Sequence, residues 1–540
     1  MASTANPERA ISAAPPPPAF AQAALPVTNR GLLTLGVMAA TIMQILDSTI
    51  ANVALPHMQS ALGGTSETIT WVLTSYIVAS AIAIPLTGWL SDRIGSRNLF
   101  LSAVAGFVLA SMLCGLAVNL TSMVVFRILQ GIFAAFMNPL SQTVMLDINP
   151  PDRQARAMSI WGMGIMVGPI MGPLLGGWLT ENYDWRWVFY VNVPIGVGCF
   201  AILWALLPSR PIRKRTFDLF GFTMLAIALA SFQIMLDRGQ TKDWFDSWEI
   251  RLEAMLAASS AWMFVVHMLT GKNPMFDRAL LTNRNLMTGL GFMLVVGILM
   301  FATMALLPPM LQRLFGYPVL DTGLLLMPRG IGIVMSMAVA GQAIQRNVDP
   351  RWLVGTGLVI AVASLWQMTT WTLLMGEADF VWTGFVQGIG LGLVFIPLNL
   401  SAFSTLAPQQ RTEGASLMNL FRNIGASVGI SVVTALLGYN IQSEHMSIGG
   451  HVTAYSVSSI DPSISGALGS TGEGLMAMVD AEVNRQAAMI AYLDDFKLMM
   501  ILTIIALPLV VLLKRATKPQ PGAKDEMPHV GLTSRQAALQ

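Results

Sequence analysis

An acidic residue lies deep inside the first long apolar segment of the chain. Asp47 belongs to the sequence LDSTIANVALP (46–56), in an apolar segment at 31–55 that is long enough to cross a bilayer. A charge near the middle of a bilayer costs roughly 2.5–3.5 kcal/mol even on a lenient scale, so this carboxylate should face a cavity or a partner. In such a place it can bind and release protons, although a structural ion pair between two helices remains the alternative. Asn52 in the same sequence is a further candidate for lining a substrate cavity.

Arg127 is the natural partner for this carboxylate. We expect it at a similar depth, five or six residues inside the outer end of the segment 122–147. An arginine stays protonated there, and it can stabilise an ionised carboxylate or lose that partner when the carboxylate takes a proton. Gln130 follows one turn later on the same face and extends the polar cluster. A fixed structural pair with no part in coupling stays open as an interpretation.

The sequence GMGIMVGPIMGPLLGG (162–177) combines a glycine row with two prolines. Small residues at every fourth position leave one face of a helix bare, so that another helix can approach closely. This face consists of Gly164, Gly168, Gly172 and Gly176, with Gly177 following. Pro169 and Pro173 remove backbone donors and bend the helix. We interpret the segment as a hinge or seal between bundles, whereas ordinary packing would explain the glycines alone.

A short polar joint, GWLSDRIGSR (88–97), follows the second apolar segment. A carboxylate near the start of the next helix can interact with that helix dipole and brace the bundle in one conformation. The residues assigned to this gating loop are Gly88, Asp92, Arg93, Gly95 and Arg97. An ordinary basic inner loop would explain the arginines but neither the glycines nor the aspartate.

Two further arginines lie within apolar segments of the second half of the chain. Arg329 belongs to MPRGIG and Arg422 to NLFRNIGASVG, and no acidic residue lies deep in the segments between 286 and 437. Each arginine must find a partner, extend to the interface or line water. We consider both as possible substrate-cavity residues that interact with an anionic group, and a structural contact at the inner end is the alternative.

Composition and spacing identify the elements that must position these residues. Hydrophobic residues make up 54% of the 540 residues and charged residues only 11%, where soluble proteins have about 25%. This predicts an all-α polytopic membrane protein, because apolar segments of helical length recur with short polar joints. The fourteen expected spans are 31–55, 70–90, 99–118, 122–147, 157–179, 188–207, 218–236, 252–270, 286–308, 320–343, 352–374, 380–403, 414–437 and 496–513.

The distribution of basic residues sets the expected topology. Most of the 31 Lys and Arg residues fall on one side if both termini are cytoplasmic, as the positive-inside rule requires. The sequences at 88–97 and 127–140 are weakly repeated at 341–351 and 384–398, which predicts two parallel six-helix bundles. The expected organisation is a disordered tail (1–30), a first bundle (31–208), two inserted helices (209–285), a second bundle (286–515) with an outer loop (439–494), and a cytoplasmic tail (516–540). Helical apolar spacing occurs within that loop at 475–495.

Several functional classes are excluded or disfavoured by the sequence. The net charge of +2 gives no indication of a nucleic-acid partner. No Walker loop, HExxH or GxSxG with a plausible triad is found, so we expect neither ATP hydrolysis nor another enzymatic activity. Energy should therefore come from an ion gradient rather than a cofactor, and a potential of about 150 mV provides roughly 3.5 kcal/mol per charge.

These motifs together resemble the major facilitator superfamily, specifically the fourteen-helix drug:proton antiporter family typified by QacA and EmrB. The similarity is carried by LDSTIANVALP, GWLSDRIGSR, RILQGIFAA (127–135), GPIMGPLLGG, WRWVFYVNVPIG (185–196), LLPPMLQRLFGYPVLDTGLLLMPRG (306–330) and NRQAAMIAYLDDF (484–496), the last of which favours the EmrB group. Ser96 stands where a basic residue is commoner in the family.

The resemblance implies a proton-driven multidrug exporter that works by alternating access. It implies that Asp47 is a proton or substrate carboxylate and that Arg127 is its partner. It also implies a periplasmic adaptor protein and an outer-membrane channel as partners, and hence a Gram-negative inner membrane, with the outer loop as a candidate docking element. Two alternatives remain: export of one endogenous metabolite, and a receptor or scaffold without turnover. An importer is disfavoured by the double Gly-Pro sequence.

Overall fold

The computed structural model describes residues 23–65, 68–210, 212, 216–452 and 473–513, and this part of the chain is helical without strands. The principal helices are α1 (Arg30–Leu62), α2 (Trp71–Ala83), α3 (Leu86–Ile94), α4 (Ser96–Gly115), α5 (Leu120–Asp147), α6 (Pro151–Asn182), α7 (Trp187–Tyr190), α8 (Asn192–Leu206), α9 (Leu219–Arg238), α10 (Trp248–Thr270), α11 (Arg278–Thr282), α12 (Arg284–Arg313), α13 (Val319–Gln345), α14 (Pro350–Met368), α15 (Glu377–Phe403), α16 (Arg411–Gly449) and α19 (Glu473–Ala506). The tails expected at 1–30 and 516–540 lie mostly or wholly outside the described residues.

The described helices confirm the expected class of membrane protein. Thirteen are long and apolar enough to cross a bilayer, and the pair α2 and α3, bent by 60° at a short break, is a fourteenth candidate. Pro85 lies at this break, where the missing amide hydrogen removes a helical hydrogen bond. The span expected at 70–90 is therefore a broken one.

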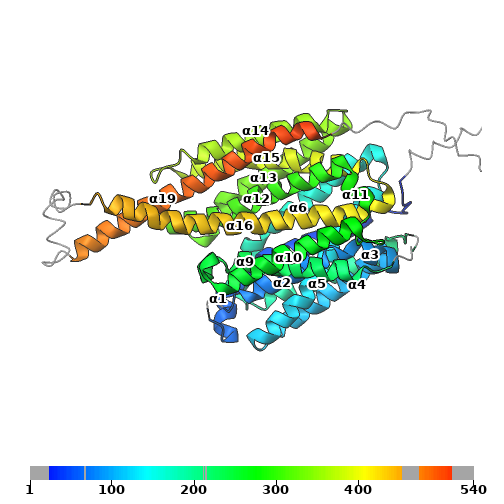
Figure 1. Ribbon diagram of the computed structural model, residues 1–540, viewed down its shortest axis with the longest axis horizontal. Helices are drawn as coiled ribbons and strands as arrows, with labels where there is room; N and C mark the ends of the chain where they lie inside the picture. Colours follow the sequence, from blue (N-terminus) through cyan, green and yellow to red (C-terminus); the bar gives the residue numbers. More distant parts are fainter. Residues whose placement is uncertain (1–22, 66–67, 211, 213–215, 453–472, 514–540) are drawn as a thin grey trace, which may run out of the picture.

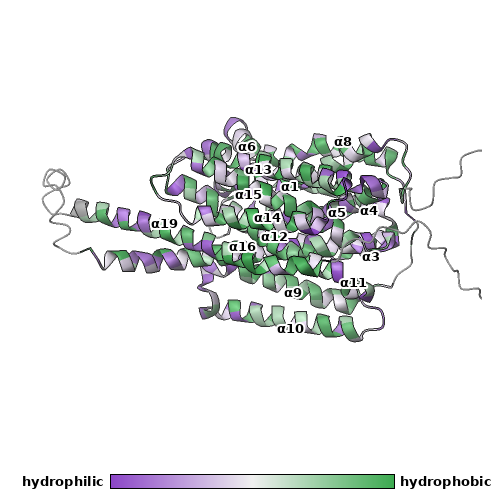
Figure 2. Ribbon diagram, turned by 90° about the horizontal axis from the view of Figure 1, so that it is seen from above, coloured by the Kyte–Doolittle hydropathy of each residue, from purple (hydrophilic) through white to green (hydrophobic). Residues whose placement is uncertain are grey.

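The helices form two groups joined by an inserted pair (Figures 1 and 2). In the first group, α1 packs on α6 and α8, and α5 packs on α2 and α4. In the second, α13 and α14 pack on α15, and α12 packs on α16. The inserted helices α9 and α10 pack together, and α9 contacts α2 of the first group and α16 of the second.

The two bundles meet near the end of the molecule where the described chain begins, which we call the terminal side. Leu25 lies there, and its backbone amide donates to the carbonyl of Asp147 at the end of α5. Every residue of α5 from Ala134 to Asp147 is buried, and so is every residue of α15 from Gly390 to Asn399. A helix that is buried on all sides must be covered by helices from more than its own bundle.

Amide side chains cross this interface between the bundles. Gln142 of α5 donates to Asn399 of α15 over 2.6 Å and accepts from Asn419 of α16 over 3.2 Å. We call these three residues the amide contact. Because all three are at least 96% buried, these hydrogen bonds form away from water, where an unpaired amide would be costly.

The last two long helices extend beyond the others on the side opposite the terminal side, as Figures 1 and 2 show. α16 has 39 residues and α19 has 34, and at about 1.5 Å per residue each exceeds the bilayer core of about 30 Å. The region expected as an outer loop at 439–494 is thus helical through Gly449 and again from Glu473. His445 and Asp480 join the two helices over 2.9 Å. We call the projecting parts of helices α16 and α19 the α16–α19 hairpin.

The amide contact predicts how accessibility should respond to mutation. Ser416 is buried on α16 beside the contact, so S416C should react slowly with an impermeant maleimide added from the terminal side. The change Gln142→Leu removes two buried hydrogen bonds worth about 1 kcal/mol each and should raise the labelling rate about thirtyfold. The background lacks the buried native thiols, Cys114 and Cys199. Asn98→Leu, an exposed amide on α4, is the control, and equal labelling rates in both variants would contradict the assignment.

Candidate functional site

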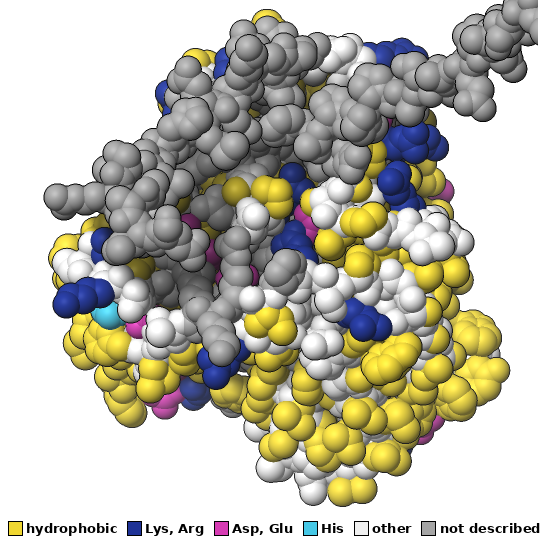
Figure 3. Space-filling view, turned by 90° about the vertical axis from the view of Figure 1, so that its right-hand side faces the viewer, with side chains coloured by type: hydrophobic (Ala, Val, Ile, Leu, Met, Phe, Trp, Pro, Cys, Tyr) yellow, Lys and Arg dark blue, Asp and Glu magenta, His cyan; other side chains and the backbone are white. Residues whose placement is uncertain are grey.

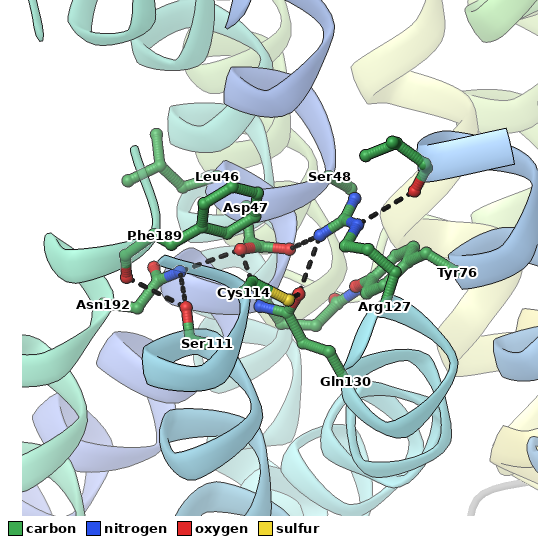
Figure 4. A network of polar contacts seen from close by, with 12 residues as sticks. Leu46, Asp47, Ser48, Tyr76, Ser111, Cys114, Arg127, Gln130, Phe189 and Asn192 are labelled. Atoms are coloured by element: carbon green, nitrogen blue, oxygen red, sulfur yellow. Dashed lines mark hydrogen bonds and ion pairs between the residues drawn. The ribbon is translucent and has the colours of Figure 1, made fainter. Parts of the chain in front are cut away.

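The structure joins the two charges that the sequence placed at similar depth. Asp47 on α1 accepts from Arg127 Nη1 on α5 over 2.8 Å, and neither side chain has exposed surface (Figure 4). The other carboxylate oxygen accepts from Gln130 Nε2 and from Asn192 Nδ2, each over 2.8 Å. The carboxylate therefore has three donors, from two helices other than its own, which compensates for its removal from water.

The guanidinium of Arg127 is held from several directions. Its Nε donates to the Val72 carbonyl of α2 over 3.0 Å, and its Nη1 also donates to Gln130 Oε1 over 2.8 Å. The Tyr76 ring lies 4.4 Å from the guanidinium carbon, a distance at which the ring face stabilises a cation (Figure 4). A capping box of Asn119 with Ser122 fixes the start of α5 two turns earlier. The arginine is thus held in place by contacts other than the one with the Asp47 carboxylate.

Asn192 is a further residue of this polar cluster, which was not predicted from the sequence. It is fully buried at the start of α8, and its Nδ2 atom also donates to Ser111 of α4 over 3.0 Å. Ser111 in turn donates to the Phe189 carbonyl over 2.9 Å. The sequence contains a signal for it, because Asn192 is a polar residue inside the apolar segment at 188–207.

Protonation of Asp47 would change which groups Arg127 can pair with. With Asp47 ionised, the pair carries no net charge and all three donors are used. A proton on the carboxylate would remove the attraction and leave Arg127 with the neutral acceptors Val72 and Gln130 only. Within the described residues, Arg127 Nη2 and Asn192 Oδ1 are buried without a partner. The site therefore has a spare donor and a spare acceptor for a rearranged state.

A polar row continues from this site along α1 and α5 toward the bundle interface. Gln44 donates to the Tyr76 hydroxyl over 3.2 Å and accepts from Asn138 over 2.8 Å. Asn138 lies one turn before Gln142 of the amide contact. One face of α5 therefore connects the Asp47–Arg127 pair with the place where the bundles meet.

The loop residues assigned to gating lie at the terminal side. Gly88 faces α16, since a Cβ atom there would be 3.2 Å from Glu413. Gly95 connects α3 and α4 with a φ of +87°, a conformation that side chains rarely adopt. Asp92 and Glu413 both line a pocket of about 490 Å³ at this face. The loop thus contacts the second bundle at Gly88, and its role in gating stays a prediction.

The two arginines of this loop are turned toward tryptophans. Arg97 donates to the Trp204 carbonyl over 2.6 Å, and its guanidinium lies 5.6 Å from that ring. Arg93 lies 5.4 Å from the Trp89 ring. These contacts connect α4 with α8 and brace α3, all within the first bundle.

An ion cluster that sequence reasoning missed lies close to this loop. Asp147 pairs with Arg411 of α16 over 3.1 Å and also with Arg210, which follows α8. Burial lowers the pKa of Arg210 to about 10, and the charge of Arg411 adds to this effect. The cluster therefore ties the first bundle to the second at the terminal side. The sequence signal was weak because all three residues lie in or next to joints that are ordinarily charged.

The glycine row of α6 faces α1 within the first bundle. A Cβ atom at Gly164, Gly168 or Gly172 would lie 2.1–2.5 Å from a side-chain atom of α1. Thr49 of α1 also donates to the Gly168 carbonyl over 3.2 Å. The expectation of close helix approach is correct, but the partner is α1, so this row does not itself seal one bundle against the other. Gly176 continues the row against Ile50, Gly177 meets nothing within 4 Å, and Pro169 and Pro173 are half-buried.

Another set of α6 residues meets the second bundle. A Cβ atom at Gly341 of α13 would lie 2.0 Å from Ser159 Oγ, and one at Gly330 would lie 2.1 Å from Ile170. Small residues of both helices permit the close approach between bundles here, since a Cβ atom at Gly162 of α6 would also lie 2.8 Å from Ile396 of α15. The double Gly-Pro helix therefore packs on α1 with one face and on α13 with another.

The remaining cavity candidates have different surroundings. Arg329 is buried in the second bundle and donates to the Met300 carbonyl and to Thr303 Oγ1, both on α12. Arg422 is buried on α16, and its Nε has no partner among the described residues. Asn52 is exposed on α1 and does not join the Asp47 cluster. No group of residues that could hold a metal occurs in the described part of the chain.

The fold and the buried charge pair define a class of polytopic membrane transporter, and comparison with known proteins identifies the family. The profile of the Major Facilitator Superfamily matches residues 37–430, and the chain belongs to this superfamily. It is 38% identical over 408 residues to the multidrug export protein EmrB of Escherichia coli, covering 75% of this chain and 80% of that protein. It is 36% identical over 491 residues to the fatty acid resistance protein FarB of Neisseria gonorrhoeae, covering 89% and 96%.

Solved structures agree on the fold. The human organic anion transporter MFSD10 (TETRAN) aligns with a TM-score of 0.53 at 13% identity, covering 88% of this chain and 99% of that one. A bacterial homologue of the lysosomal transporter Spinster aligns with a TM-score of 0.51 at 16% identity, covering 90% and 96%. The chain is thus a transporter of the EmrB-like type rather than an enzyme.

The geometry of the charge pair predicts a stability pattern. Asp47→Asn leaves Arg127 as a buried charge without its counterion and should destabilise the protein by about 3 kcal/mol. The double variant Asp47→Asn/Arg127→Gln removes both charges and should recover most of this loss. Thermal unfolding of purified protein in one detergent measures both. A double variant less stable than Asp47→Asn would show that the two charges are not coupled.

Proposed function

We propose that this protein is a proton-coupled antiporter that exports amphipathic toxic compounds across the inner membrane by alternating access. The observation that carries the proposal is the fully buried pair of Asp47 and Arg127, held by neutral partners on α2, α5 and α8 of the first bundle. Identity with multidrug export proteins supports the direction and the class of substrate. No cofactor is required, because the proton gradient supplies the energy.

In this mechanism a proton entering from the outer side neutralises Asp47. Arg127 then loses its counterion and becomes free to turn its unused Nη2 toward other acceptors. Because Gln44 and Asn138 join the Tyr76 side of this site to α5 near the amide contact, the change can weaken the contact between the bundles. Opening of the terminal side would then release the proton inward and admit a substrate for export.

The proposed orientation of the protein in the membrane rests on the distribution of basic residues. Basic side chains gather on the terminal face (Figure 3). Near it, Arg93 lies in the last turn of α3 and Arg97 begins α4, Arg153 lies in the first turn of α6, and Arg346 directly follows α13. Juxtamembrane Lys and Arg residues favour the cytoplasmic side. The terminal side is therefore assigned to the cytoplasm, and the α16–α19 hairpin to the outer side.

The hairpin provides a place for a periplasmic adaptor and, through it, an outer-membrane channel. Both helices extend beyond the bilayer thickness, and their exposed apolar side chains include Met446, Met476 and Met478, at 71%, 53% and 57% exposure. Exposed methionines adapt to a partner surface, and the proposal assigns this surface to the adaptor.

Proton coupling is tested in inverted membrane vesicles with an imposed pH gradient and a fluorescent pH reporter. Several unrelated amphiphiles should each dissipate the gradient in the wild type, and Asp47→Asn should abolish the response because its side chain cannot exchange a proton. Asp480→Asn, which removes an exposed carboxylate of the hairpin, is the matched control and should respond normally. A response in Asp47→Asn equal to wild type would exclude Asp47 from coupling, and a response to one metabolite only would favour a dedicated exporter.

The adaptor assignment is tested by pull-down with a periplasmic adaptor protein of the same organism. Met446→Asp with Met478→Asp places charges on the apolar surface of the hairpin and should reduce capture at least about tenfold, since buried unpaired charges disfavour an interface. Glu444→Gln with Glu482→Gln, in the same helices, is the control, and membrane levels of all variants are compared. Undiminished capture by the aspartate variant would place the adaptor elsewhere.

A further inference from the structure

One buried charge of the second bundle has no partner in the described part of the chain. Arg422 is 8% exposed, and its side chain makes no hydrogen bond or ion pair with any described residue. By contrast, Arg127 has Asp47, and Arg329 has the Met300 carbonyl and the Thr303 hydroxyl. Its Nε is buried without an acceptor, which is unfavourable unless a ligand supplies one.

The position of Arg422 on α16 places its side chain between the two bundles. Asn419, three residues earlier, contacts Gln142 of the first bundle. Gly425, three residues later, packs on the Leu294 backbone of α12. Because successive residues of a helix turn by about 100°, Arg422 projects between these two directions, into the angle between α5 and α12.

A second unsatisfied polar group lies at the same level on the opposite bundle. Asn138 of α5 is 8% exposed, and its Oδ1 atom has no partner among the described residues, while its Nδ2 donates to Gln44. Gln142 and Asn419 are in contact, and α5 and α16 run in opposite directions away from that contact. Asn138 and Arg422 therefore each lie about one turn beyond the amide contact, on its outer side.

The surroundings of Arg422 suit a ligand with one charge and an apolar body. Its backbone carbonyl lies against Gly297 of α12. At this level α12 contributes the buried residues Met293, Val296 and Met300. A planar guanidinium matches the two oxygens of a carboxylate, and an amide can donate to the same group if its side chain turns. No acidic side chain of the described chain competes for the arginine.

We propose that Arg422, with Asn138 opposite, binds the carboxylate of amphipathic monocarboxylic acids just outside the amide contact. This inference rests on the proposed export function and names a substrate class for it. The name of the relative FarB, a fatty acid resistance protein, is consistent with such a class. Because ligand binding here joins α5 to α16, a bound acid bridges the two bundles beside their existing contact.

The test measures binding to purified protein in nanodiscs of phosphatidylcholine. Radiolabelled dodecanoate is compared with dodecanol, which has the same tail without the charge, and with the cation tetraphenylphosphonium. Dodecanoate should bind the wild type at least about tenfold more tightly than dodecanol, the scale expected for a charged hydrogen bond. Arg422→Gln should lose this difference and Arg422→Lys should retain part of it, while tetraphenylphosphonium binding stays unchanged in both.

The same variants also show whether a loss of binding comes from misfolding. Removal of an unpaired buried charge should leave the unfolding temperature of Arg422→Gln unchanged or raised in the absence of ligand, and dodecanoate should stabilise only proteins with a charge at position 422. Arg411→Gln removes another arginine of α16, one that pairs with Asp147 at the terminal side, and it should keep the preference for dodecanoate over dodecanol. Equal dodecanoate affinity in the wild type and Arg422→Gln, or no dodecanoate binding by the wild type, would overturn the proposal.

A phospholipid phosphate offers the same negative charge, so the experiment is repeated with phosphatidylglycerol in the nanodiscs. Displacement of dodecanoate by this lipid in the wild type, but not in Arg422→Gln, would assign the site to a lipid and overturn the assignment to a substrate acid. Binding is also independent of proton coupling. If the protein binds dodecanoate but transports nothing in vesicles, the export function alone is refuted. If it transports tetraphenylphosphonium but Arg422→Gln leaves dodecanoate binding unchanged, this inference alone is refuted.

Discussion

The absence of water inside a bilayer is the constraint on which the first bundle depends. A carboxylate and a guanidinium can lie there only if each finds the other and neutral donors or acceptors satisfy the rest. Asp47 and Arg127 meet this condition with partners from α2, α5 and α8. The positions of these helices are thus fixed by one ion pair, and any event that changes its charge acts on several helices at once.

The helix α5 carries this constraint to the other bundle. Its N-terminal half holds Arg127 and Gln130, and its buried C-terminal half holds Gln142 and Asp147, which contact the second bundle. A helix transmits displacement along its axis because its backbone hydrogen bonds keep it stiff. A shift of Arg127 relative to Asp47 would therefore be felt at both interbundle contacts without any intermediate loop.

Features that follow from the depth of a charge in an apolar segment, or from the helical spacing of residues, could be predicted from the sequence. Features that depend on which helices come into contact could not. Asp47 and Arg127 could be paired because both are charges at similar depth in apolar segments. The glycine row of α6 predicted close approach, but its partner α1 could not be read from spacing. Asn192 and Gln142 escaped notice because an amide costs less to bury than a charge, so its presence in an apolar segment is a weaker signal. Helical spacing at 475–495 predicted the helical part of the outer loop that α19 forms, whereas the extension of α16 to Gly449 was not predicted, because polar residues outside a bilayer are equally compatible with a loop and a solvated helix.

The two bundles share a fold but distribute charge differently. The first bundle neutralises its arginine internally, so its buried charge changes only when a proton binds or leaves. The second bundle has Arg329 and Arg422 with no carboxylate paired to either in the described chain. A charge balanced by a proton and a charge left for an external anion respond to different species. In the proposed mechanism, this asymmetry would let one bundle respond to the proton gradient while the other binds the substrate, and α5 contacts both.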